Sequence, residues 1–482
     1  MGDRKTKYTI ISSLIWKLLE KSGVQGVQFI IQIMLARILL PEEYGLIALS
    51  SIFIIIANVF VQTGFGTALI QKKEVEEIDY SSVFYINISV AVLLYMIIYL
   101  VAPSVSKFYN MPEMINVLRV LSLTLLIGSV NSIQLAVIAR HMAFKKLFFS
   151  SIGAIVISGI VGVSMALNGF GVWALVGHQL TNHLMVTVIL WFFVDWRPKR
   201  LFSLERVKVL LSFGWKLLVS TLLDRLYDNL KSLFIGKIFT TAMLGFFNRG
   251  KQFPNLIISN INGSIQSVLF PALAAEQEDR GRVKAIVRRS IVTSSFIIFP
   301  MMMGLIVTAK PMVLILLTDK WLPAVPFIQI FSVSYALWPI HTANLQAINA
   351  LGRSDIFLKL EVIKKVIGVM ILLISLRWSI YIIALGGVLS NIIYTFINAY
   401  PNKKLLDYSY KEQMTDILPS FIIAFIMGLL VYSVRFLNLT EGLTLLIQIP
   451  SGIIVYITLA KVLKLESFVY LIDTIKDFNM NA

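Results

Sequence analysis

Charged and amide side chains interrupt an otherwise apolar stretch at residues 211–239. The middle of this stretch carries Asp224, Arg225, Asp228, Asn229 and Lys231. Asp224, Asp228 and Lys231 follow a spacing of i, i+4 and i+7, which places them on one side of a helix. A charged side chain at the centre of a bilayer costs about 2.5 kcal/mol or more, so this side is expected to face protein or a water-filled cavity rather than lipid.

The stretch at residues 9–39 has the same character. Its polar residues follow a spacing of i, i+4, i+8, i+11 and i+15, with an acidic residue alongside. They are Lys17, Lys21, Gln25, Gln28 and Gln32, and the acidic residue is Glu20. Two polar-faced helices at corresponding places in the chain predict two halves around one central, hydrated and cationic chamber.

The composition is that of an integral membrane protein. Of the 482 residues, 57% are hydrophobic and only 14% are charged, whereas a soluble domain of this size needs far more polar surface. A helix needs about 20 apolar residues to cross the hydrocarbon core, and about fourteen stretches are candidates. They are 9–39, 44–63, 80–102, 115–138, 147–168, 171–193, 211–239, 243–272, 287–308, 324–349, 356–376, 380–400, 415–435 and 442–463. The N-terminal residues lack the pattern of a cleavable signal peptide, so the first span is expected to be retained.

Basic residues gather in alternate loops, and this asymmetry predicts an orientation. Lys and Arg are concentrated at the N-terminus, in connections such as 197–208 and 280–289, and near the C-terminus. The positive-inside rule then places both termini in the cytoplasm. The same loops account for the net charge of +17, so nucleic acid is not expected as a partner.

Several kinds of chemistry are excluded or disfavoured by the residue types. The chain contains no cysteine, so disulfides, thiol catalysis and Cys-based metal sites are excluded. Its four histidines show no metal-binding spacing, and no loop is long enough to form a soluble catalytic domain. We therefore expect no bound metal, no cofactor and no enzymatic activity.

An internal repeat relates the two polar-faced stretches. Trp16-Lys17-Leu18-Leu19 recurs as Trp215-Lys216-Leu217-Leu218, and Tyr44-Gly45 aligns with Leu244-Gly245. The offset is about 200 residues, or six spans, so the copies should share one orientation and be related by an axis along the membrane normal. The predicted organisation is an N-terminal six-helix bundle at 1–196, a basic cytoplasmic linker at 197–208, a C-terminal six-helix bundle at 209–404, and two additional helices with a cytoplasmic tail at 405–482.

Four short motifs resemble signatures of one transporter family. They are Gly169-Phe170-Gly171-Val172-Trp173-Ala174-Leu175-Val176, Leu244-Gly245-Phe246-Phe247-Asn248-Arg249, Arg37-Ile38-Leu39-Leu40-Pro41-Glu42-Glu43-Tyr44-Gly45 and Leu351-Gly352-Arg353-Ser354-Asp355. They resemble the polysaccharide transporter branch of the multidrug/oligosaccharidyl-lipid/polysaccharide exporter superfamily, near the colanic-acid and teichuronic-acid flippases. The motifs extend from the first to the eleventh span, so the resemblance covers most of the chain.

The resemblance implies a V-shaped pair of six-helix bundles in the bacterial cytoplasmic membrane. Such proteins move undecaprenyl-diphosphate-linked oligosaccharides from the inner to the outer leaflet by alternating access. It also implies a polysaccharide polymerase and chain-length machinery as partners, and we expect a monomer. A cationic, water-filled lumen would replace the water that solvates the phosphates. In such a lumen, Arg binds phosphate through two parallel hydrogen bonds and Lys acts as a point charge.

The predicted lumen residues are the cations near the polar faces and the loops between spans. They are Lys17, Lys21, Arg37, Arg119, Arg225, Lys231, Arg249 and Lys251. Glu20, Asp224 and Asp228 are candidates to separate those cations between cargoes or to carry a coupling H+ or Na+.

Structural roles for these residues stay open alternatives. Lys17 could instead extend to the cytoplasmic interface, Arg37 could anchor the outer interface, and the charged pairs of 211–239 could only fix helix packing. Lys364 and Lys365 could face the chamber or extend to the interface. His178, His183 and His341 are more typical of packing or hydrogen-bonding groups than of proton relays, but neither reading is fixed by the sequence.

Three other functions remain alternatives. A multidrug/cation antiporter of the same superfamily should have a more acidic or apolar lumen. A lipid II flippase has a diphosphate cargo as well, and only the signatures argue against it. A polytopic glycosyltransferase or glycan polymerase would need catalytic residues in a sizeable outer loop, and the outer loops of this chain are short.

Overall fold

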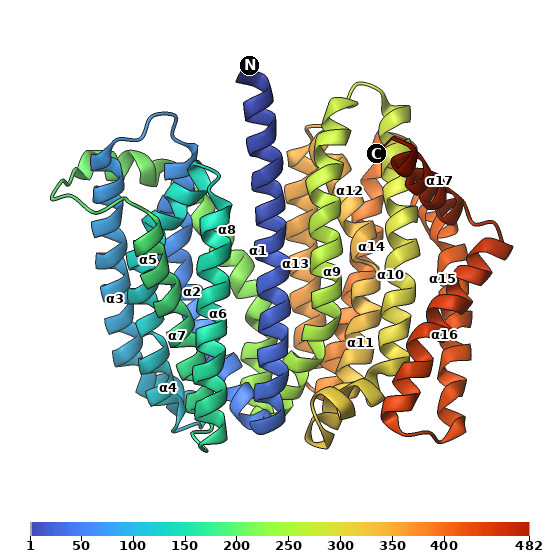
Figure 1. Ribbon diagram of the computed structural model, residues 1–482, viewed down its shortest axis with the longest axis horizontal. Helices are drawn as coiled ribbons and strands as arrows, with labels where there is room; N and C mark the ends of the chain where they lie inside the picture. The colour runs from blue at the N-terminus through green and yellow to red at the C-terminus, as the bar shows by residue number, and fades with distance from the viewer. Residues whose placement is uncertain (1, 482) are drawn as a thin grey trace. The chain divides into compact units, whose positions relative to one another are not determined.

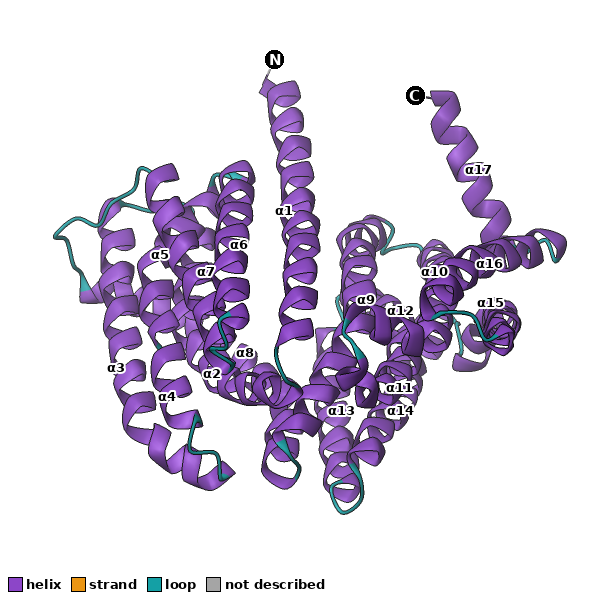
Figure 2. Cartoon of the chain, turned by 60° about the horizontal axis from the view of Figure 1, so that its bottom comes forward, coloured by secondary structure: helices purple, strands orange, loops and turns teal. Residues whose placement is uncertain are grey.

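The computed structural model is helical throughout the part of the chain that it describes (Figures 1 and 2). It describes the backbone of residues 2–481 and the side chains of residues 16–477, apart from those at 18, 63–65, 213 and 475. Ten helical segments in this part are long and apolar enough to cross a membrane. The predicted all-α membrane fold class is confirmed, whereas the count of about fourteen spans stays a prediction.

Two of the longest helices fall outside those ten segments for a chemical reason. Helix α1 (Gly2–Ile38) and helix α8 (Leu204–Ile238) are both longer than a bilayer requires. They are also the helices that carry the charged and amide residues singled out in the sequence, and these residues interrupt their apolar stretches. The two helices with the most unusual chemistry for a membrane are therefore less apolar than the helices of the ten segments.

By internal contacts the chain divides into two compact units, Met1–Gly245 and Phe246–Ala482. The first unit contains α1, α2 (Pro41–Gln71), α3 (Glu77–Tyr109), α4 (Met114–Leu121), α5 (Leu123–Arg140), α6 (Phe144–Leu167), α7 (Val172–Phe193), α8 and the start of α9 (Thr241–Ala275). The second contains the rest of α9, α10 (Arg280–Leu316), α11 (Val325–Ala336), α12 (Trp338–Ala350), α13 (Ser354–Ser375), α14 (Ile380–Leu406), α15 (Tyr410–Ser433), α16 (Glu441–Val462) and α17 (Glu466–Asn481), with 3-10 turns at Asp319–Ala324 and Val434–Leu437. The domain boundaries derived from the sequence repeat stay predictions.

In the first unit, α6 packs along α1 and α7, and α2 packs along α5 and α8. The turn before α7 uses two glycines with positive φ, Gly169 at 77° and Gly171 at 55°. A Cβ on Gly171 would lie 2.6 Å from the Glu43 carboxylate, which also accepts the Leu40 N–H at 2.7 Å. The glycine-rich motif therefore lets the start of α7 approach the start of α2, which a larger residue would prevent.

Polar side chains inside the first unit pair with one another across helices. Asn87 on α3 donates to Ser132 on α5 at 3.0 Å, and Asn131 on α5 donates to Thr187 on α7 at 2.7 Å. Buried amides are costly unless they are hydrogen-bonded. These pairs therefore fix the alignment of α3, α5 and α7.

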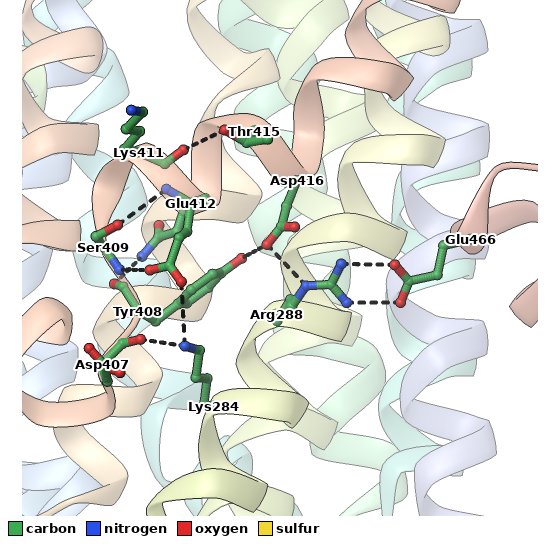
Figure 3. Close-up of polar contacts among 11 residues, drawn as sticks. Lys284, Arg288, Asp407, Tyr408, Ser409, Lys411, Glu412, Thr415, Asp416 and Glu466 are labelled. Carbon is green, nitrogen blue, oxygen red and sulfur yellow. Dashed lines mark hydrogen bonds and ion pairs between the residues drawn. The ribbon is translucent and has the colours of Figure 1, made fainter.

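In the second unit, α10 is the central helix and packs against α11, α12, α15 and α16. The additional C-terminal helices α15 and α16 pair with each other and with α10, and Tyr456 on α16 donates to the Phe296 carbonyl at 2.7 Å. The last helix, α17, is attached at one end by an ion pair. Figure 3 shows Arg288 bonded through both Nη atoms to Glu466, at 2.9 and 2.8 Å, and through Nε to Asp416 at 3.1 Å.

The repeat detected in the sequence has a counterpart in the helix ends. Helix α1 ends at Ile38 and α2 begins at Pro41. Helix α8 ends at Ile238 and α9 begins at Thr241, each 200 residues later. The chain therefore turns in the same way at the two places where the repeat aligns Tyr44-Gly45 with Leu244-Gly245.

Candidate functional site

The predicted lumen cations of α1 are accessible. Lys17 pairs with Glu20 at 2.9 Å, and its side chain is 47% exposed. Its ammonium also lies 5.3 Å from the ring centroid of Phe144 at the start of α6. Lys21 and Arg37 are exposed. Because Glu20 is one turn from Lys17, the pair is an i, i+3 helix contact, which contributes only a few tenths of a kcal/mol and can open easily.

The charged residues of α8 are accessible to different degrees. Asp224, Arg225 and Asp228 are exposed, and Lys231 is half-buried. The side-chain amide of Asn229 donates to the Arg225 carbonyl at 2.8 Å, so Asn229 satisfies its own helix rather than a neighbour. The charges of this face thus remain accessible within the first unit, although the contact of any of them with cargo stays a prediction.

Two other predicted cations are held by aromatic rings. The guanidinium of Arg119, at the end of α4, lies 4.0 Å from the ring centroid of Tyr99, and its Nε donates to the Tyr99 carbonyl at 3.3 Å. In the second unit, Arg249 is 5% exposed, donates to Gln252 at 2.6 Å, and lies 5.2 Å from the ring centroid of Trp321. Cation–π contacts of this kind are stronger when the cation is desolvated. Packing therefore accounts for both positions, and the predicted cargo contacts of Arg119, Arg249 and the half-buried Lys251 stay predictions.

A polar hollow inside the second unit was not anticipated from the sequence. It has a volume of about 450 Å³ and lies among α9, α12, α13 and α14. Its polar lining includes Asn262 and Gln266 on α9, His341, Thr342, Gln346 and Asn349 on α12, Lys364 on α13, and Asn391, Tyr394 and Asn398 on α14. Ligand sites of small molecules have volumes of this order.

Helix α14 shows why these residues share one face. Asn391, Thr395, Asn398 and Asn402 follow steps of 4, 3 and 4 residues, which is the spacing of one side of a helix. Asn391 donates to the Ser334 hydroxyl of α11 at 2.5 Å. Asn402 lies at the other end of this face and is fully buried. The polar face of α14 is therefore fixed by hydrogen bonds at Asn391 and Asn402, and the hollow lies between these two positions.

Two of these residues hold His341 in a defined orientation. Its Nδ1 lies 3.1 Å from the amide nitrogen of Asn398, and its Nε2 lies 3.3 Å from the Thr395 hydroxyl. An amide nitrogen can only donate, so Nδ1 accepts and the ring proton is on Nε2, directed at Thr395. On the opposite side, Thr342 donates to Asn262 at 2.5 Å and ties α12 to α9.

Lys364 lines the hollow with its charge balanced. Its side chain is 10% exposed, and its ammonium donates to Glu361 at 2.6 Å on the same helix. Tyr394 donates to the Lys364 carbonyl at 2.7 Å and thereby joins α14 to α13. The sequence left Lys364 open between a chamber-facing and an interfacial position, and the structure places it inside the second unit.

A second amide cluster next to the hollow is purely structural. Asn344 on α12 exchanges hydrogen bonds with Gln413 on α15, at 2.8 and 3.0 Å, and its side-chain oxygen accepts from Asn402 at 2.6 Å. All three side chains are fully buried. This network links α12, α14 and α15 and holds the frame in which the neighbouring polar residues are accessible.

The sequence carried a signal for the hollow. The regular spacing of amides on α14 is as evident as the spacing of charges on α8. The residues that α9, α12 and α13 add to the hollow are brought there by tertiary packing, which sequence spacing does not reveal.

Comparisons with known proteins agree with the signatures in the sequence. The family described as polysaccharide biosynthesis protein matches residues 34–326. The teichuronic acid biosynthesis protein TuaB of Bacillus subtilis (strain 168) is 22% identical over 93% of this chain and 95% of its own length. The lipopolysaccharide biosynthesis protein WzxC of Escherichia coli (strain K12) is 24% identical over 87% of each chain. The succinoglycan biosynthesis transport protein ExoT of Rhizobium meliloti (strain 1021) is 25% identical over 68% of this chain and 66% of its own length, just under two thirds.

Solved structures share the fold. The lipid II flippase MurJ in an inward closed conformation matches with a TM-score of 0.75 and 16% identity, over 93% of this chain and 98% of that one. A multidrug resistance transporter of the MATE family in an inward-facing conformation matches with a TM-score of 0.61 and 14% identity, over 79% of this chain and 94% of that one. The fold is therefore that of multi-span membrane transporters.

Proposed function

This chain belongs to the polysaccharide biosynthesis protein family, and from that premise we propose that it is a flippase for lipid-linked oligosaccharides. It moves undecaprenyl-diphosphate-linked repeat units from the inner to the outer leaflet of the bacterial cytoplasmic membrane, for the synthesis of a surface polysaccharide. The observation that carries the proposal is the family match over residues 34–326 in a chain whose described residues include ten segments long and apolar enough to cross a membrane.

The named relatives support a role in transport rather than catalysis. One is named as a succinoglycan biosynthesis transport protein, and others as teichuronic acid and lipopolysaccharide biosynthesis proteins. The fold is shared with a flippase of lipid II. A transporter of this kind needs no catalytic residues, because the cargo leaves chemically unchanged.

The physical requirement of the cargo matches the chemistry of α1 and α8. A diphosphate carrying sugars cannot cross hydrocarbon without substitutes for its water shell. The proposed contacts are the cations Lys17, Lys21, Arg225 and Lys231, with Arg37, Arg119, Arg249 and Lys251 as further candidates. Glu20, Asp224 and Asp228 would neutralise these cations between cargoes or carry a coupling H+ or Na+, and the polyprenyl tail would stay in lipid.

Orientation and partners complete the proposal. Both termini lie in the cytoplasm, as the distribution of basic loops predicts. The protein acts by alternating access, as a monomer, and delivers its cargo to a polysaccharide polymerase and chain-length machinery. No metal or organic cofactor takes part.

Charge reversal on α8 tests the proposed contacts. Arg225→Glu and Lys231→Glu, at normal protein level, are expected to leave lipid-linked sugar units on the cytoplasmic leaflet and to deplete the surface polysaccharide. Lys208→Glu is the matched control, because Lys208 is an exposed cation near the start of the same helix, away from the polar face.

Two outcomes distinguish a failure of the proposed cargo contacts from a failure of the proposed flippase function. Normal surface polysaccharide and normal intermediates in both α8 variants would remove these residues from the cargo path. Deletion of the whole gene without any change in surface polysaccharide or in lipid-linked intermediates would contradict the flippase function itself. A lipid II flippase is recognised by a different result, the loss of peptidoglycan precursors from the outer leaflet.

A further inference from the structure

We propose that the hollow among α9, α12, α13 and α14 is a binding subsite for the sugar part of the cargo, distinct from the cations that would receive the diphosphate. This inference rests on the proposed function, because it assumes a glycan-bearing lipid as cargo. It assigns the recognition of sugar hydroxyls to the second unit. The argument follows from the polar groups, the charge and the rings that line the hollow.

Neutral donors and acceptors make up most of the polar groups in the lining. Amide groups come from α9, α12 and α14, and the remaining polar groups are mainly hydroxyls and an imidazole. A side-chain amide offers two donors and an acceptor, which matches a sugar hydroxyl that donates and accepts at once. A metal ion or a phosphate would instead require carboxylates or a surplus of cations.

The charge balance selects sugar over diphosphate. Lys364 is the cation in the lining, and it is bonded to Glu361 at 2.6 Å. An anion entering here would have to break that pair in a site that is 90% shielded at the lysine side chain, and it would leave the carboxylate unpaired. Glu361 is 29% exposed, so the pair is only part-buried, but a neutral ligand leaves it intact and is therefore favoured over an anion.

One acceptor in the lining is unsatisfied. Asn398 is 1% exposed, and its amide nitrogen is engaged by His341. Its side-chain oxygen has no hydrogen-bond partner among the residues that the structure describes. A buried acceptor without a partner is unfavourable. This oxygen is itself inaccessible, so a ligand hydroxyl can donate to it only when the neighbouring side chains move.

Aromatic rings supply the apolar complement that a sugar face needs. Trp338, Phe357 and Tyr394 line the hollow from α12, α13 and α14. Each presents a large apolar surface with little conformational freedom to lose, and Trp and Tyr also carry a polar group. Rings together with amides fit a pyranose better than they fit a phospholipid headgroup, which has no apolar ring face of its own.

The position of Phe357 permits a direct test by photocrosslinking. The photoreactive residue p-benzoylphenylalanine is introduced at Phe357 in cells that express the full chain and make the polysaccharide. The matched control places it at Leu358, the next residue of α13, whose side chain is 64% exposed. The expected result is an adduct at Phe357 whose mass includes sugar residues, with at least a tenfold lower yield at Leu358.

Substitutions in the lining then identify the polar contacts. In the Phe357 photoprobe background, Gln346→Leu and Asn398→Leu should each reduce the glycan adduct severalfold at unchanged protein level. Asn402→Leu shows the effect of damage to the supporting network, because Asn402 bonds Asn344 instead of lining the hollow; it is expected to lower the protein level rather than the adduct per folded protein. Gln346 is only half-buried and forms no structural bridge to another helix among the described contacts, so its variant is expected to fold even if Asn398→Leu does not.

The outcomes decide between the subsite and its competitors. A phospholipid adduct, no adduct at Phe357, or equal yields at Phe357 and Leu358 would overturn the proposal. An unchanged glycan adduct in a folded Gln346→Leu protein would also overturn it. If gene deletion still abolishes the polysaccharide in any of those cases, the flippase function stands and only the subsite fails.

Discussion

Two glycines that the repeat aligns permit a sharp test of the structure. A Cβ on Gly45 would lie 1.9 Å from the Thr241 carbonyl oxygen, and a Cβ on Gly245 would lie 2.2 Å from the Pro41 carbonyl oxygen. The contacts are reciprocal, because each glycine faces the first residue of the helix that contains the other. We expect Gly45→Ala and Gly245→Ala to lower the melting temperature markedly.

The magnitude follows from the distances. Ordinary contact of a Cβ begins at 3.4 Å, so at Gly45 the neighbouring helix would have to retreat by about 1.5 Å, and the obstacle is backbone that cannot change rotamer. Overpacking of well-packed interiors costs about 1–3 kcal/mol, and a clash with backbone belongs at the upper end of that range. Helix propensity returns only about 0.5–1 kcal/mol when glycine becomes alanine.

The same substitution in open space provides the control. A Cβ on Gly304 in α10 meets nothing within 4 Å, so Gly304→Ala should raise the melting temperature slightly through helix propensity alone. The assay is thermal unfolding of the detergent-solubilised protein, followed by fluorescence-detected size exclusion. A shift of the same sign and size in Gly45→Ala and Gly304→Ala would refute the close approach of α2 and α9.

Three further predictions concern the ends of helices. Arg140→Ala should destabilise the protein by about 1–2 kcal/mol, measured as a lower melting temperature, because its guanidinium donates to the Leu69 and Lys72 carbonyls at the end of α2. Arg288→Ala should lower the free energy of unfolding by about 2–3 kcal/mol, because it leaves Asp416 unpaired and only 17% exposed. Glu466→Gln should lower it by at most about 1 kcal/mol, because Glu466 is 65% exposed. Equal losses of stability in the two variants would contradict this ranking (Figure 3). Arg288 also holds the pKa of Glu466 below its ordinary value, so the contribution of this ion pair to the attachment of α17 should be complete above about pH 4.3 and lost as the pH falls through the lower folded value. Protease cleavage of α17 should therefore increase on acidification in the wild type and show no such step in Glu466→Gln.

Composition and spacing were sufficient for the fold class and for the polar faces of two helices. Apolar stretches of bilayer length are a local property, and so is the spacing of Asp224, Asp228 and Lys231. The motif around Gly169 and Gly171 was likewise informative, because positive φ at a tight turn leaves few residues to choose from. These features depend on short segments and were therefore accessible from one sequence.

The structural roles of individual cations were not accessible in this way. Arg119 and Arg249 looked equivalent to the α8 cations, yet each lies against an aromatic ring from another segment, Tyr99 and Trp321. The hollow lined by Lys364 combines residues from four helices. Sequence spacing specifies which residues share a helix face, but the partner of that face is decided by packing.

The two polar features of this chain differ in charge, and that difference bears on how a carrier releases its cargo. The face of α8 carries ionised groups, whereas the hollow of the second unit is neutral because Lys364 is paired with Glu361. Each hydrogen bond to a sugar contributes about 0.5–1.5 kcal/mol net, so four of them would give about 2–6 kcal/mol, which corresponds to dissociation constants from tens of millimolar to tens of micromolar. A neutral amide site can therefore distinguish sugars without trapping them, since translocation requires binding that is favourable enough for entry and weak enough for exit. A strongly cationic sugar site would bind its cargo more tightly and would therefore release it more slowly. This is a physical reason for the pairing of Lys364 with Glu361.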